Sequence, residues 1–83
     1  MSDGKPDMVA LIELLAKAIV EAPDEVTVEP FAENGLTVLE LIVAEEDLGR
    51  IIGRHGRTAR SLRTILHSAS IRPRKRYQLE IVE

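Results

Sequence analysis

Apolar residues recur at spacings of three and four along residues 8–22, a pattern typical of an amphipathic helix. Pro23 follows directly and ends the pattern, because proline cannot continue a helix. A helix with one apolar stripe buries that stripe, so we expect these positions to face the core: Met8, Leu11, Ile12, Leu15, Ala18, Ile19 and Ala22.

Two strands joined by a tight turn are predicted next. Residues 26–29 alternate with period two, and Pro30 suits an edge strand or the end of a strand, because it cannot donate to the ladder. Asn34 and Gly35 form a strong hairpin signal, since both tolerate positive φ. Residues 36–44 are apolar at nearly every position, which favours a central strand.

A short helix is predicted after the second strand. Glu45, Glu46 and Asp47 place negative charge where that helix would begin, which favours its positive N-terminal dipole. Paired carboxylates for acid–base chemistry are the less favoured interpretation of the same residues. Gly53 ends the short helix.

A longer helix over residues 57–70 is predicted to lead into a basic loop at 72–76 and a third strand at 77–82. One face of this helix is apolar and is expected to be buried; it comprises Ala59, Leu62, Ile65, Leu66 and Ala69. The opposite face is basic and comprises Arg57, Arg60, Arg63 and His67.

The element order is therefore α-β-β-α-α-β, which predicts an α+β fold. The third strand follows a helical crossover and should run parallel to the second, giving a three-stranded mixed sheet with three helices packed on one face. We expect residues 1–7 to form a flexible N-terminal segment and residues 8–83 to form a single domain.

Composition narrows the class of protein. With 83 residues and no cysteine, the chain has room for one small core and offers no disulfide or thiolate metal site. It has no apolar run long enough to span a membrane and no signal-peptide pattern at its start, so we expect a cytoplasmic location without membrane insertion.

Charge is strongly segregated along the chain, although the formal net charge is only −3. Residues 1–49 hold twelve of the fourteen acidic residues, whereas residues 50–76 hold nine of the eleven basic residues and no acidic residue. A field of one sign confined to a third of the chain favours a polyanionic partner.

The turn Gly53-Arg54-His55-Gly56 is the element that carries candidate chemistry. Its two glycines permit a tight bend and close approach of another chain, and the following helix directs its N-terminal amides and dipole at the bend. With Arg54 and Arg57 beside it, a phosphodiester could lie across the turn. The bases would face the apolar residues of the preceding helix, Leu48, Ile51 and Ile52.

The stretch Ile52-Gly53-Arg54-His55-Gly56-Arg57, within this element order, resembles a KH domain of type II with its GXXG loop, and more narrowly the KhpA family of small bacterial single-KH proteins. The resemblance implies a type II KH fold that binds about four nucleotides of single-stranded RNA at the loop. It also implies a homodimer, a second KH-domain protein as partner, and a role as RNA chaperone or post-transcriptional regulator linked to cell division and envelope growth.

The candidate RNA-binding residues that follow are Ile51, Ile52, Gly53, Arg54, His55, Gly56, Arg57, Arg60 and Arg63. For Arg60 and Arg63, direct contact with RNA and a merely solvated helix face are equally favoured interpretations. For the basic loop at 72–76, contact with RNA is the less favoured interpretation. The scarcity of aromatic residues argues against an RRM or cold-shock surface.

No nucleophile, base or metal-ligand constellation is apparent, so we expect no enzyme activity, cofactor, metal or small-molecule substrate. Two alternatives stay open. The domain could serve mainly as a dimerisation partner of a second KH-domain protein, and single-stranded DNA could replace RNA, since no residue can be assigned to a 2′-hydroxyl.

Overall fold

The computed structural model describes residues 7–71 and 76–83. The flexible segment expected at 1–7 lies outside the described residues apart from Asp7, and so does the basic loop apart from Arg76. The helices and strands are α1 (Met8–Ile19), β1 (Thr27–Glu33), β2 (Leu36–Ile42), α2 (Leu48–Ile52), α3 (Arg57–Ala69) and β3 (Arg76–Ile81). The predicted α+β class and the order α-β-β-α-α-β are confirmed.

The sheet has the predicted topology. Its strand order is β1-β2-β3, with β1 antiparallel and β3 parallel to the central strand β2. Asn34 and Gly35 form the hairpin with φ values of 52° and 79°, the conformation that a primed turn requires. The first strand is longer than predicted and continues through Pro30 to Glu33, which an edge strand permits because its outer side needs no donor.

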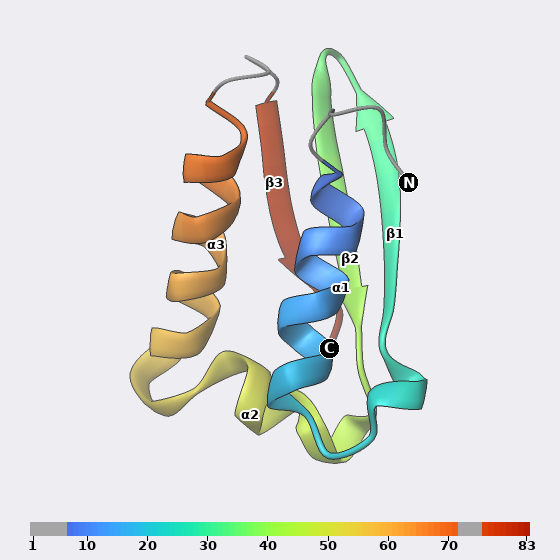
Figure 1. Ribbon diagram of the computed structural model, residues 1–83, viewed down its shortest axis with the longest axis vertical. Coiled ribbons are helices and arrows are strands. Elements are labelled where there is room, and N and C mark those ends of the chain that lie inside the picture. The colour runs from blue at the N-terminus through green and yellow to red at the C-terminus, as the bar shows by residue number, and fades with distance from the viewer. Residues whose placement is uncertain (1–6, 72–75) are drawn as a thin grey trace.

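The helices share one side of the sheet (Figure 1). Helices α1 and α3 lie side by side over the strands, and α2 closes this layer at one end. The largest side chains with almost no exposed surface come from the three helices and the central strand β2, and they belong to one core: Ile12, Leu39, Leu41, Ile51 and Leu66.

Helix α1 is shorter than its apolar pattern predicts. It ends at Ile19, and Val20 is extended with ψ 164°, so the three residues before Pro23 are not helical. Within the helix, Ala16 is buried and Ala18 is exposed, the reverse of the predicted stripe. Ala16 follows Ile12 by four residues and so continues its row along the helix axis.

Helix α3 buries a narrower face than predicted. Ala59, Leu62 and Leu66 are buried, whereas Ile65 is 39% exposed. The prediction that Ile65 belongs to the core is therefore wrong. Ile65 lies beside Ser61 and Thr64, which are both exposed.

No helix in the described ranges is both long and apolar enough to cross a membrane.

Candidate nucleic-acid interface

The turn between α2 and α3 is built from left-handed backbone. Gly53 ends α2 with φ 78° and ψ 170°, and Gly56 precedes α3 with φ 73° and ψ 15°. His55 between them also has positive φ, 58°, a conformation that histidine adopts more readily than most residues. The turn is closed by a hydrogen bond of 3.1 Å from the amide of Gly56 to the carbonyl oxygen of Gly53.

The two glycines meet different constraints. A Cβ atom on Gly53 would lie 2.2 Å from the Thr58 Oγ1 atom and 2.7 Å from the Thr58 backbone nitrogen. A Cβ atom on Gly56 would meet nothing within 4 Å. Gly53 is therefore needed for both its φ and the close approach of α3, whereas Gly56 is needed for its φ alone.

Only some of the amides that the sequence directs at a phosphate are available. The amide of Gly56 is paired with Gly53, and the amide of Arg57 donates to the carbonyl oxygen of Arg54. Within the described part of the chain, no side chain caps the N-terminus of α3.

The arginines around the turn differ in the contacts that their side chains already make. Arg54, Arg57, Arg60 and Arg63 are exposed. Arg60 Nη2 donates to the carbonyl oxygen of His55 over 3.3 Å, which ties the first turn of α3 to the bend. Arg50, by contrast, pairs with Glu21 at 2.9 Å and with Asp47 at 3.5 Å, so its charge is already balanced.

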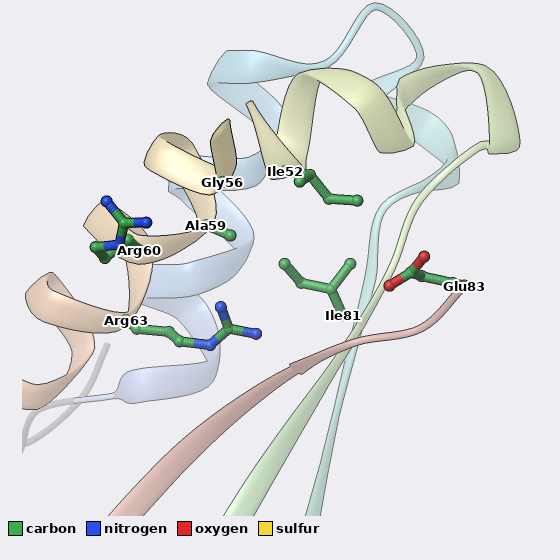
Figure 2. Close-up of a pocket in the computed structure, with 7 residues that line it drawn as sticks. All are labelled: Ile52, Gly56, Ala59, Arg60, Arg63, Ile81 and Glu83. Carbon is green, nitrogen blue, oxygen red and sulfur yellow. The ribbon is translucent and has the colours of Figure 1, made fainter. Parts of the chain in front are cut away.

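A groove of about 330 Å³ extends from the turn between α3 and β3. Figure 2 shows Ile52 from α2 and Ile81 from β3 facing each other, with Arg60 and Arg63 on the α3 side. Arg63 Nε donates to the carbonyl oxygen of Leu79 over 3.4 Å, so this guanidinium spans from α3 to the free edge of β3. The groove thus has an apolar floor and a cationic wall, an arrangement that fits bases inside and phosphates along the rim.

The model of the family described as "KhpA/KhpB, KH domain" matches residues 9–81. The chain belongs to this family. A relative named "RNA-binding protein KhpA" from Treponema pallidum (strain Nichols) is 48% identical over 73 residues, which cover 88% of this chain and 91% of the relative. The KhpA protein of Thermotoga maritima is 41% identical over 75 residues, covering 90% of this chain and 99% of that protein.

A solved structure shares the fold at much lower identity. A crystal structure of a variant of Era from Aquifex aeolicus superposes with a TM-score of 0.63 and 17% identity. The match covers 89% of this chain and 29% of the longer Era chain. At this identity the likeness concerns the KH fold alone.

The structure of this KH domain brings together only part of the predicted site. Gly53, Arg54 and His55 form the turn, and the groove beyond it is lined by Ile52, Gly56, Arg60 and Arg63. Arg57 instead lies on another surface of α3, beside Ser61 and Thr64. Among the described residues, Arg60 is the one that borders both this surface and the groove. Leu48 is half-buried and lies outside the groove lining.

Ile51 has a different place from the one the sequence indicates. Its side chain is 0% exposed and packs in the core of the KH domain with Ile12 and Leu62. Direct contact between Ile51 and a base is therefore incompatible with this structure. Ile51 anchors α2, while Ile52 beside it is half-buried and faces the groove.

Three groove residues were not identified from sequence: Ala59, Ile81 and Glu83. Ile81 and Glu83 belong to the end of the chain, and β3 parallel to β2 carries that end back toward the start of α2. The predicted parallel pairing of the third strand with the second could have indicated that the end of the chain lies near this groove. Glu83 adds an acceptor opposite the arginines, as Figure 2 shows.

Asp47 lies at the start of α2 as predicted, and it has a further role that the sequence does not indicate. It is 2% exposed and caps no amide of α2. Its Oδ1 and Oδ2 atoms accept from the amides of Glu21 and Ala22, at 3.0 and 3.1 Å. Asp47 therefore joins the segment after α1 to the start of α2, directly before the turn.

Acidic and histidine side chains form no metal-binding group of three or more within residues 7–71 and 76–83.

Proposed function

We propose that this KH domain is a non-catalytic module that binds about four nucleotides of single-stranded RNA at the turn formed by residues 53–56. The observation that carries the proposal is the groove between α3 and β3, which begins at the glycine turn and has arginines along one wall. The name "RNA-binding protein" carried by the family relatives supports RNA as the nucleic acid.

Separate parts of the site would bind separate parts of the nucleotide. The amides of Arg54 and His55, with the exposed guanidinium of Arg54, would bind one phosphate. Arg60 and Arg57 would neutralise neighbouring phosphates on either side of α3. Ile52 and Ile81 would pack against bases that enter the groove.

The decisive experiment reverses the charge of the turn. In the double variant Arg54→Asp/His55→Asp, binding of a fluorescein-labelled short RNA, measured by fluorescence anisotropy, should be lost because carboxylates would face the phosphate. Aspartate also tolerates the positive φ of position 55, so circular dichroism should show an unchanged fold.

Lys17→Asp is the control for charge reversal elsewhere on the domain. With histidine counted as neutral, the double variant changes the charge by three units and Lys17→Asp changes it by two, on an exposed position of α1 outside the groove lining. Wild-type affinity in the folded turn variant, or equal loss in both variants, would refute the function proposed for residues 53–56.

The wider setting of the proposal follows from the family resemblance. A KH domain over residues 8–83 would act in the cytoplasm as an RNA chaperone or post-transcriptional regulator, linked to cell division and envelope growth. Depletion of the chain, followed by sequencing of crosslinked RNA and by measurement of cell length, would test both parts. Normal cells with unchanged RNA levels would contradict this setting.

A second candidate function is protein interaction, either as a homodimer or with a second KH-domain protein. The observation that favours it is exposed apolar surface: Leu14 on α1 is 68% exposed and Phe31 on β1 is 55% exposed. Co-purification after nuclease treatment separates the two functions, since a partner held by protein contacts would persist. Sedimentation of the purified chain would identify a homodimer.

A further inference from the structure

A second cavity, of about 500 Å³, lies at the far end of α3 from the turn. Its polar lining comes from the end of α3 and the start of β3: His67, Ser70, Arg76, Tyr77 and Gln78. Neither the predicted site nor the proposed four-nucleotide site uses these residues. The cavity contains an aromatic ring, a guanidinium, an imidazole and a side-chain amide, groups that stack on bases or bond to nucleotides.

The two cavities lie in line along α3 and β3, which run side by side in opposite directions (Figure 1). On α3, Arg63 lines the first cavity and His67, one helical turn later, lines the second. On β3, Ile81 lines the first and Tyr77 the second. The hydrogen bond from Arg63 to Leu79 lies between them, so one guanidinium separates the cavities.

The charge along this line suits a single polyanionic strand. Helix α3 contains no acidic residue, and its exposed arginines continue from the turn to the Arg63 position. Arg76 then supplies a further exposed cation at the second cavity. A strand that leaves the first groove along α3 would therefore pass Arg60 and Arg63 and then reach Arg76.

We propose that single-stranded RNA held at the 53–56 turn continues past Arg63 into the second cavity, where Arg76 binds a phosphate and His67, Tyr77 and Gln78 contact an additional base. The site would thus take more than four nucleotides. This inference rests on the proposed RNA-binding function. It assigns Arg76 a contact that the sequence pattern alone does not favour.

The test compares two lengths of RNA. Fluorescein-labelled RNAs of four and ten nucleotides with randomised sequence are titrated with the full chain and with the variants Arg76→Gln and His67→Gln, each checked by circular dichroism. Each variant should weaken binding of the ten-nucleotide RNA by about two- to fivefold, the range of an exposed ionic or polar contact, and leave the four-nucleotide RNA unaffected. Lys17→Gln, which removes a charge from α1, should affect neither length.

The possible outcomes separate the two proposals. If both cavity variants weaken the two lengths equally, or neither length, while Arg54→Asp/His55→Asp abolishes binding of both, the second cavity is not part of the site but the proposed function stands. If the wild-type chain binds neither length, both proposals fail. A loss confined to the ten-nucleotide RNA supports the extended site.

Discussion

Gly53 lies so close to Thr58 that a Cβ atom on Gly53 would approach the Thr58 backbone nitrogen to 2.7 Å. The contact joins the residue that directly follows α2 to the first turn of α3. It sets how sharply the chain bends at the candidate site, because neither backbone can retreat without moving a helix. Gly53 is therefore required for both its positive φ and this close approach, whereas Gly56 is required for its positive φ alone.

We predict that Gly53→Ala destabilises the fold more than Gly56→Ala. Gly53 combines φ 78° with ψ 170°, a region nearly restricted to glycine, and the added methyl group also collides with Thr58. We expect a loss of about 3 kcal/mol at Gly53 and about 1 kcal/mol at Gly56, where only the left-handed conformation is unfavourable. Urea unfolding followed by circular dichroism gives both values.

Thr58→Ala provides the control for this prediction. It removes the Oγ1 atom but leaves the backbone nitrogen in place, so it should not rescue Gly53→Ala. Full rescue would mean that the side chain of Thr58, and not the approach of the two backbones, makes glycine necessary at position 53.

These glycines show which parts of the fold the sequence can predict. The hairpin at Asn34 and Gly35 and the turn that starts at Gly53 were predicted because their backbone demands are local. The role of Asp47 was not predicted, because its partners Glu21 and Ala22 lie 26 and 25 residues away along the chain. No local pattern contains that pairing.

The groove illustrates the same division. The groove residues from α2, the turn and α3 were predicted because they lie in one continuous stretch of sequence. Ile81 and Glu83 were not, because they reach the groove only through the pairing of β3 with β2. The burial of two isoleucines was predicted wrongly. Its place on the helix before the turn assigned Ile51 to the site, and periodicity assigned Ile65 to the core. The arrangement of the helices instead buries Ile51 and exposes Ile65.

We therefore predict unequal effects of shortening two neighbouring side chains of α3. Leu66 is 2% exposed in the core, so Leu66→Ala should lower the free energy of unfolding by about 3 kcal/mol. Ile65 is 39% exposed, so Ile65→Ala should change it by about 0.5 kcal/mol. Thermal unfolding of the two variants measures the difference, and similar losses would contradict the orientation of α3.

Asp47→Ala should also be strongly destabilising. The variant would leave the amides of Glu21 and Ala22 without their acceptor in a part-buried position, and we expect a loss of about 3 kcal/mol. Asp47→Asn keeps one acceptor oxygen and should lose less. Glu46→Gln, at the exposed neighbouring position, is the control and should stay within about 0.5 kcal/mol of wild type in urea unfolding.

The salt dependence of RNA binding tests which arginines meet phosphates. If three or four phosphates are neutralised, log K against log salt concentration should have a slope of about −2 to −3 for a single strand. Arg54→Gln should reduce the size of that slope by about 0.7, because Arg54 is exposed at the turn and its cation is available. Arg50→Gln should leave the slope unchanged, since Arg50 is paired with Glu21 and Asp47. Equal reductions in the two variants would mean that RNA senses the overall charge of this part of the chain, and that the turn does not select the phosphate.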